Sequence, residues 1–259
     1  MATALIGGLL QQGFKPGDLR VVEVSQEARA RLQQQFGVST VAAIDQEIPE
    51  DAVLLAVKPQ QLRSVAQALR AHLKGQLVIS IAAGIRTADL ARWLGGHERI
   101  ARVMPNTPAL VRSGVSGLYA GPAVKQVDRD STQNILGAVG AVVWVQDEAD
   151  IDVVTAISGS GPAYVYYFIE ALEQAGAELG LSNRQAHDLA VQTFVGAAKL
   201  ASGSDEPAAV LRARVTSKAG TTEAALNAMD AGDVKRRIMD AVRAAARRSK
   251  ELGDEFGKD

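Results

Sequence analysis

Residues 51–80 read DAVLLAVKPQQLRSVAQALRAHLKGQLVIS, and their pattern decides the fold class of this chain. A short apolar run at Val53–Val57 is followed by a segment of helical periodicity at Gln60–Leu73. Gly75 then supplies a helix stop signal before the next apolar run at Leu77–Ile81. Two buried runs joined by an amphipathic helix are typical of an α/β sheet with helices on its faces.

The same alternation extends over residues 19–145 and then stops. Besides the runs named above, the pattern predicts strands at Arg20–Val24, Ile100–Val103, Val115–Tyr119 and Val142–Val145. Further helices are predicted at Gln26–Phe36, Thr87–Leu94 and Arg129–Val139. After Asp150 the alanine-rich segments all read as helix, at Ile151–Ile157, Ala163–Leu179, Asn183–Ala201, Ala208–Ala213, Glu223–Met229 and Asp233–Leu252. We therefore expect a nucleotide-binding α/β domain at residues 1–150 and an all-helical domain at residues 151–259.

The composition excludes several classes of function. With 259 residues and a net charge of -1, the chain has no excess of basic residues that would make nucleic acid or an anionic membrane its main partner. It has no cysteine, which excludes disulfides and thiolate metal sites and fits a reducing cytoplasm. His72, His97 and His187 are scattered without paired ligands, so we predict no metal site. Met1–Leu10 lacks a basic flank and is predicted to be a buried helix, not an export signal, and no apolar run approaches the ~18 residues of a membrane span.

A second informative stretch is Val215–Asp230, VTSKAGTTEAALNAMD. It places the hydroxyls of Ser217, Thr221 and Thr222 at the start of an apolar-periodic helix. Gly220 lets the backbone come close to a bound molecule. Because the free N–H groups at a helix start favour a carboxylate, this stretch predicts a site for a small anionic metabolite. An ordinary Ser/Thr-rich helix cap is the alternative interpretation.

Four further motifs span most of the remaining chain. They are Ala56-Val57-Lys58-Pro59, Ser80-Ile81-Ala82-Ala83-Gly84, Met104-Pro105-Asn106-Thr107-Pro108 and Ser158-Gly159-Ser160-Gly161-Pro162-Ala163-Tyr164. Together with Val215–Asp230, and in this order and spacing, they resemble the motifs of the pyrroline-5-carboxylate reductases. That family makes proline by reducing a cyclic imine with a nicotinamide cofactor. Ala219 departs from the family pattern, which more usually has a second glycine there, and slightly stiffens the loop.

The resemblance implies a Rossmann-type domain followed by an all-helical dimerisation domain. It implies NADPH or NADH as cofactor, 1-pyrroline-5-carboxylate as substrate and L-proline as product. The assembly it implies is a homodimer, often built into a ring of five dimers. By the same resemblance Thr222 is the catalytic residue that contacts the imine nitrogen. Ser217, Gly220 and Thr221 would hold the substrate carboxylate.

Residues that follow the predicted strands are candidates for the cofactor site, because ligands bind at the carboxyl ends of the strands in this architecture. Glu23 would accept the ribose 2′-hydroxyl of NAD, whereas Ser25 would favour the 2′-phosphate of NADP. We place Lys58 at a ribose or phosphate and Asn106 at the nicotinamide side. The full predicted set is Met1, Ala2, Glu23, Ser25, Ala56, Val57, Lys58, Pro59, Ala82, Ala83, Gly84 and Asn106.

The start of the chain departs from the family pattern. Met1–Leu9 looks like the helix that follows the glycine-rich turn, with Met1-Ala2 matching the last two positions of that fingerprint. The first strand and the turn glycines are absent, and we interpret Gly7 and Gly8 as helix-packing residues. Either the sequence starts at an internal methionine of a longer protein or the protein lacks this element. We expect the first, because loss of a central strand leaves the neighbouring strand edges unpaired.

Two other functions are compatible with parts of the sequence. A 3-hydroxyacid dehydrogenase has the same layout, but it would need a lysine and an asparagine one turn apart, and Lys199 is followed by Gly203 at that distance. A binding protein that keeps the pyrroline pocket without a cofactor is supported only by the absent glycine turn. The presence of Lys58, Asn106 and Thr222 argues against it.

Overall fold

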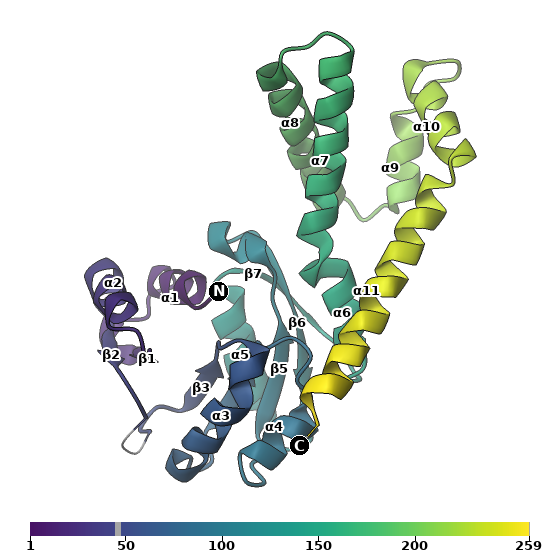
Figure 1. Ribbon diagram of the computed structural model, residues 1–259. Coiled ribbons are helices and arrows are strands. Elements are labelled where there is room, and N and C mark those ends of the chain that lie inside the picture. Colours follow the sequence, from purple (N-terminus) through teal and green to yellow (C-terminus); the bar gives the residue numbers. More distant parts are fainter. Residues whose placement is uncertain (45–47, 259) are drawn as a thin grey trace. The chain divides into compact units, whose positions relative to one another are not determined.

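A computed structural model describes residues 1–44 and 48–258, which form two compact units (Figure 1). The first unit contains Met1–Ser160 together with Ala245–Asp259, and the second contains Gly161–Ala244. The packing therefore changes after Ser160, whereas the domain boundary expected near residue 150 stays a prediction. Each unit is described by itself.

The first unit is an α/β fold built on a five-stranded sheet of order β3-β4-β5-β6-β7. Strands β3, β4 and β5 are mutually parallel, β6 runs antiparallel to β5, and β7 is parallel to β6. The strands are β3 (Ala52–Leu55), β4 (Leu77–Ser80), β5 (Ile100–Met104), β6 (Gly114–Ala120) and β7 (Gly140–Trp144). The helices are α1 (Ala2–Gln11), α2 (Gln26–Phe36), α3 (Pro59–Leu69), α4 (Thr87–Trp93), α5 (Gln126–Gly137) and α6 (Asp150–Val154).

The sheet has an apolar cluster on each face because its strands alternate their side chains. Leu77 and Ile79 of β4 pack with residues of α1 and α5, whereas Val78 between them packs with residues of α3 and α4. Gly8 allows α1 to approach closely, since a Cβ there would lie 2.5 Å from the Ala138 carbonyl oxygen. The interpretation of Gly8 as a packing residue is thus confirmed.

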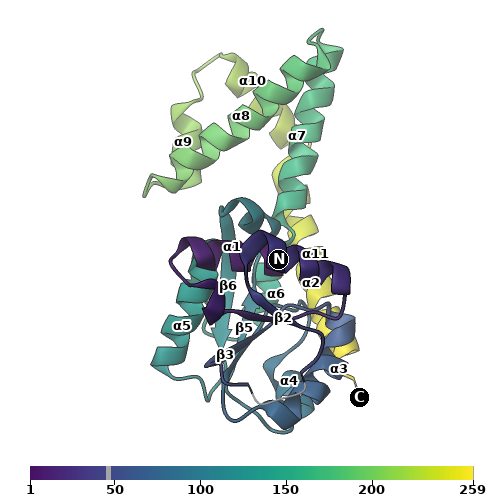
Figure 2. The same ribbon diagram turned by 90° about the vertical axis from the view of Figure 1, so that its left-hand side faces the viewer.

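A second, smaller sheet pairs β1 (Arg20–Val22) with β2 (Ser39–Val41) in parallel (Figure 2). The sequence pattern did not predict β2, because three residues are too few to show a period and its first two are polar. Within the described ranges, the strand pairings do not join this sheet to β3 or to any other strand of the larger sheet.

The second unit is helical throughout its length. It contains α7 (Gly161–Glu178), α8 (Asn183–Ser202), α9 (Ala208–Arg214), α10 (Thr221–Ala231) and the first turns of α11 (Val234–Phe256). Helices α7 and α8 form a hairpin in which Gly176 meets Ala186 and the Glu173 carboxylate accepts a 2.7 Å hydrogen bond from His187 Nδ1. No helix in the described part of the chain is long and apolar enough to cross a membrane.

Candidate active site

A cavity lies where the parallel strands of the first unit end. Its volume is about 250 Å³, and its walls are formed by Met1, Ala56, Val57, Lys58, Ile81, Met104 and Pro105. The strand register places these residues together, because Leu55 of β3 pairs with Ser80 of β4, and Ser80 pairs with Arg102 of β5. The chain that follows each strand therefore reaches the same edge of the sheet, where nucleotides bind in open α/β folds.

Lys58 supplies the positive charge of this cavity. It precedes Pro59, which occupies the first position of α3, so the helix begins directly at the cavity wall. Among the residues that the structure describes, the Lys58 ammonium has no ion-pair partner. A free cation beside apolar walls suits a ligand that carries a phosphate or a ribose on one side and a flat ring on the other.

The N-terminus of α1 is a second feature, besides Lys58, that favours the binding of an anion in this cavity. Met1 lines the cavity and caps α1, and Leu5 is the first residue to donate to the helix ladder, at 3.1 Å to the Met1 carbonyl. The amide groups of Ala2 and its neighbours in the first turn thus stay free for a ligand.

The end of β1 holds the residues predicted to choose between the two cofactors. Glu23 accepts a hydrogen bond from the Ser25 amide at 2.8 Å, and the Ser25 hydroxyl accepts from Ala28 at 3.3 Å and caps α2. Arg29, which the sequence analysis missed, donates to the carbonyls of Glu23 and Val24 at 2.7 and 2.9 Å. One negative and one positive side chain therefore stand at the same strand end.

Ala82, Ala83 and Gly84 follow β4 but do not line the cavity, which Ile81 does instead. Gly84 has a left-handed backbone with φ of +72°, and a Cβ there would lie 3.3 Å from Leu252 and Phe256 of α11. This glycine serves the packing of α11 on the sheet. Approach of Ala82-Ala83-Gly84 to a cofactor stays a prediction.

Asn106 is directed into the protein and not toward a ligand. Its side-chain amide donates to the Ser158 carbonyl at 3.1 Å, and its side-chain oxygen accepts from the Val115 amide at 2.9 Å. With only 9 % of its surface exposed, Asn106 joins the end of β5 to β6 and to the segment after α6. The geometry therefore does not favour a direct contact between the Asn106 amide and nicotinamide.

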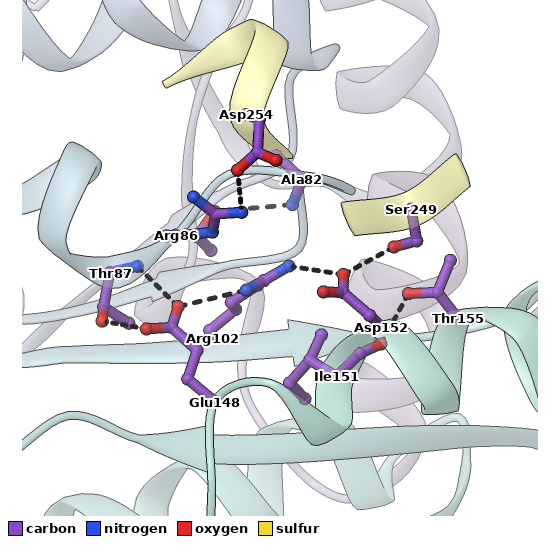
Figure 3. A network of polar contacts seen from close by, with 11 residues as sticks. Ala82, Arg86, Thr87, Arg102, Glu148, Ile151, Asp152, Thr155, Ser249 and Asp254 are labelled. Carbon is purple, nitrogen blue, oxygen red and sulfur yellow. Dashed lines mark hydrogen bonds and ion pairs between the residues drawn. The ribbon is translucent and has the colours of Figure 1, made fainter. Parts of the chain in front are cut away.

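A buried ionic network connects β5 with α4, α6 and the end of α11 (Figure 3). Arg102, which is 3 % exposed, pairs with Glu148 at 3.1 Å and with Asp152 at 3.8 Å. Glu148 also accepts from the Thr87 amide and hydroxyl, and Ser249 donates to Asp152 at 2.7 Å.

A second ion pair of this region lies on its surface. Arg86 donates to Asp254 of α11 at 2.5 Å, and this guanidinium holds the pKa of the Asp254 carboxyl below its usual value. The network and this pair fix α4, α6 and the last turns of α11 on the sheet edge.

The predicted substrate loop lies in the second unit, between α9 and α10. Gly220 donates to the Ser217 carbonyl at 3.1 Å and caps α10, whose first residues are Thr221 and Thr222. The Ser217 hydroxyl lies against the Gly220 Cα, in the space that any larger side chain would fill. The structure thus brings Ser217, Gly220, Thr221 and Thr222 together at the free N–H groups of a helix start.

Ala219 takes a left-handed backbone with φ of +57° in this loop. Its amide donates to the Glu223 carboxylate at 2.7 Å, which holds the strained residue in place. A second hollow, of about 220 Å³ and lined by Asp230, Asp233, Lys235, Arg236 and Met239, contains none of the predicted residues. In the described residues no cluster of histidine, aspartate or glutamate is arranged to hold a metal ion.

Replacing Ala219 by glycine is expected to raise the free energy of unfolding. The left-handed backbone of an alanine destabilises the folded state by about 1–2 kcal/mol, and glycine removes this strain. Glycine also gives the unfolded chain more conformational freedom, which offsets about 0.4–1 kcal/mol of the gain. The net expected gain is about 0–1.6 kcal/mol, measured from urea unfolding curves. Ala228→Gly, inside α10, is the matched control and should destabilise. An Ala219→Gly protein that unfolds at lower urea than the parent would contradict this assignment of strain.

Comparison with known proteins matches the chain from end to end. Residues 148–252 match the family described as pyrroline-5-carboxylate reductase dimerisation, and residues 1–84 match NADP oxidoreductase, coenzyme F420-dependent. A pyrroline-5-carboxylate reductase of Pseudomonas aeruginosa is 44% identical over 260 residues, covering 100% of this chain and 95% of that protein. The chain belongs to the pyrroline-5-carboxylate reductase family.

Solved structures agree with this assignment. A pyrroline-5-carboxylate reductase from Coxiella burnetii has a TM-score of 0.92 and 38% identity, covering 97% of this chain and 94% of that one. The Plasmodium falciparum pyrroline carboxylate reductase with NADP bound has a TM-score of 0.84 and 31% identity, with coverages of 97% and 94%. The predictions of family and of a Rossmann-type domain followed by a helical dimerisation domain are thus confirmed, and the chain is an NAD(P)-dependent oxidoreductase of this family.

Proposed function

We propose that this pyrroline-5-carboxylate reductase family member reduces 1-pyrroline-5-carboxylate to L-proline with NADPH or NADH, as the last step of proline biosynthesis. The observation that carries the proposal is the cavity at the ends of β3, β4 and β5, because Ala56, Val57 and Lys58, which belong to the proposed cofactor-binding set, line it. A family member that lacked cofactor binding would have no reason to keep a cationic cavity at this edge.

The residues present fit a nicotinamide dinucleotide. Ile81, Met104 and Pro105 give apolar walls for a flat ring, and Lys58 gives a charge partner for a ribose or phosphate. The first turn of α1 offers free N–H groups to the pyrophosphate. When bound, the reduced cofactor supplies a hydride to the imine carbon.

The loop before α10 is proposed to hold the substrate. Ser217, Gly220 and Thr221 would bind its carboxylate with hydroxyl and N–H donors at the helix start. The Thr222 hydroxyl would hydrogen-bond the imine nitrogen and relay a proton to it, so that the nitrogen of the product carries the added proton. The protein's contribution is mostly orientation and charge complementarity, since neither a metal nor a covalent intermediate is needed.

The direct test is the oxidation of NADPH followed at fixed enzyme with 1-pyrroline-5-carboxylate. We expect turnover that depends on both compounds and yields proline. A 3-hydroxyacid offered with NAD⁺ serves as the control substrate for the other dehydrogenase class. If the enzyme turns over the 3-hydroxyacid but not the imine, the proposal is wrong and the chain is a 3-hydroxyacid dehydrogenase. If it binds the nucleotide but catalyses neither reaction, the chain is a binding protein.

Replacing Glu23 by alanine is expected to shift cofactor preference toward NADPH. The Glu23 carboxylate sits at the end of β1 and would repel a 2′-phosphate there, while the guanidinium of Arg29, which reaches this strand end from α2, would attract it. Removing a repulsion of about 1 kcal/mol changes the ratio of kcat/KM for NADPH and NADH by roughly fivefold. Glu27→Ala is the control, because this exposed carboxylate on α2 pairs with Arg31 at 3.6 Å. If Glu23→Ala and Glu27→Ala have the same ratio of kcat/KM for NADPH and NADH, Glu23 is only a solvated residue at the end of the strand.

We further propose an obligate homodimer, which the resemblance extends to a ring of five dimers. Helices α7 and α8 of the second unit expose large apolar side chains that a monomer would leave in water, among them Tyr166, Tyr167, Leu172, Leu189 and Leu200. Because they gather on the hairpin of α7 and α8 and are not scattered singly, they favour a contact with another subunit.

Sedimentation velocity at low micromolar concentration tests the assembly. We expect a dimer or a larger closed species, and we expect Tyr167→Glu to shift the protein toward smaller species with loss of activity. Glu178→Gln, at the end of α7, is the control that changes charge without removing apolar surface. A monomeric parent with full activity would overturn the proposal.

A further inference from the structure

The helix α6 changes its winding just before the first unit ends. It continues into a π-turn, Thr155–Gly159, in which the Ser160 amide donates to the Thr155 carbonyl at 2.8 Å, five residues back. The hydroxyls of Thr155 and Ser158 donate to carbonyls one turn earlier, at 2.7 and 3.0 Å. Such single π-turns are rare inside α-helices and frequently stand at functional sites.

Two different polar contacts hold this segment. Asp152 in α6 is fixed by Arg102 and Ser249, so the start of the segment is anchored in the ionic network. The π-turn is held by Asn106, whose amide donates to the Ser158 carbonyl at 3.1 Å while its oxygen accepts from Val115. Because the Asn106 side chain is nearly buried and uses both ends of its amide, it bridges the π-turn and β6 in one orientation.

The π-turn also touches the cavity wall, at the Met104 side chain. A Cβ on Gly159 would lie 2.6 Å from the Met104 terminal methyl, so the glycine leaves room for Met104 to rest on the turn. Met104 in turn lines the cavity proposed to take the cofactor, together with Pro105. The chain of contacts therefore runs from Asn106 to the π-turn, and from Gly159 through Met104 to the cavity.

We propose that Asn106 is a positioning residue for the reduction, acting through the π-turn and Met104 on the part of the cavity that faces the nicotinamide ring. This inference rests on the proposed function of that cavity. The amide does not touch the ligand; it fixes the turn that sets where the Met104 side chain stands. Since hydride transfer depends steeply on the position of the donor ring, an error of about 1 Å at this wall costs rate more than affinity.

Asn106→Asp is the first test, because it removes the donor to Ser158 and keeps an oxygen for the Val115 amide. We expect kcat to fall by about tenfold to 100-fold. The Kd for NADPH, measured by fluorescence titration, should change less than about threefold, since most of the dinucleotide binds elsewhere. Ser249→Ala is the matched control: it removes one buried hydrogen bond from the same helical segment, at Asp152, and should lower stability without this kinetic split.

Gly159→Ala tests the second half of the path by a readout that needs no turnover. The added methyl group would lie 2.6 Å from the Met104 terminal methyl and pushes this side chain itself, a larger displacement than the loosened turn of Asn106→Asp causes. Here we therefore expect the Kd for NADPH to rise as well, by roughly tenfold. Combining it with Met104→Ala should return the Kd to that of Met104→Ala alone, because the clash partner is gone.

The outcomes separate the inference from the proposed function. If the parent enzyme does not reduce the imine, the proposed function fails, and the NADPH titrations of Gly159→Ala and the double variant still decide the role of Met104. If the parent is active but Asn106→Asp behaves like Ser249→Ala in both kcat and Kd, Asn106 is only a structural residue and the inference is wrong. The same holds if Met104→Ala fails to relieve Gly159→Ala.

Discussion

Thr222→Ala is expected to lower kcat for the reduction of 1-pyrroline-5-carboxylate by about 100-fold or more, the range found when a positioned proton-transfer group is removed. Thr222 is the second residue of α10, beside the free N–H groups proposed to hold the substrate carboxylate. Its hydroxyl is the group proposed to meet the imine nitrogen, so its loss acts on the reacting atoms and not on the nucleotide.

Steady-state kinetics and an NADPH titration measure this effect. The Kd for NADPH should stay within about twofold, because the nucleotide cavity lies in the other unit and its residues are unchanged. Thr222→Ser keeps the hydroxyl and should retain most of the activity. Thr221→Ala, one residue away, should raise KM for the substrate more than it lowers kcat. An unchanged kcat in Thr222→Ala would move the proton relay to another group.

Arg102→Ala is expected to have the largest effect on stability. Arg102 is buried in β5 and pairs with Glu148 and Asp152, so its removal leaves two carboxylates without their cation. Breaking a buried pair in this way costs about 3–5 kcal/mol, because the stranded charges stay desolvated. The remaining donors, Thr87 to Glu148 and Ser249 to Asp152, hold the carboxylates in place but do not neutralise them.

Urea unfolding of the oligomeric protein at constant subunit concentration measures the loss. Arg248→Ala is the control, since this arginine forms exposed ion pairs with Glu251 and Glu255 on α11 and should leave the unfolding midpoint nearly unchanged. Equal midpoints for the Arg102 and Arg248 variants would show that the network does not stabilise the fold.

The repeated alternation in the sequence was enough to predict the core of the first unit. Val53–Val57 and Leu77–Ile81 correspond to β3 and β4, and the helix between them is α3, because buried strands and amphipathic helices differ clearly in period. The strand β2 was missed because it has three residues. Helix α5 begins earlier than predicted, at Gln126. The Asp128 carboxylate accepts a hydrogen bond from the Lys125 amide and so stabilises an extra turn.

The lining of the candidate cavity could be predicted from the sequence where its residues directly follow strands. Ala56, Val57 and Lys58 line the cavity because the chain has to leave β3 at the carboxyl edge of the sheet. The partners of Asn106 were not predictable, since Ser158 lies 52 residues away and the contact depends on tertiary packing. The π-turn leaves no periodicity in the sequence that differs from an α-helix.

One further signal in the sequence concerns the ionic network. Arg102 interrupts the apolar strand Ile100–Met104, and a charge in a strand expected to be buried requires charged partners elsewhere in the chain. This reasoning would have predicted an ionic network at the sheet. It would not have identified Glu148 and Asp152 among the acidic residues near residue 150.

The most direct test of this account follows a labelled hydride. The enzyme is incubated with 1-pyrroline-5-carboxylate and NADPH that carries deuterium at the transferable C4 position, and the product is analysed by mass spectrometry and chiral chromatography. We predict L-proline carrying one deuterium per NADPH consumed. Oxidation of NADPH without labelled proline, or no oxidation when NADPH binds with its normal affinity, would contradict the central claim that this chain is a pyrroline-5-carboxylate reductase in activity as well as in family.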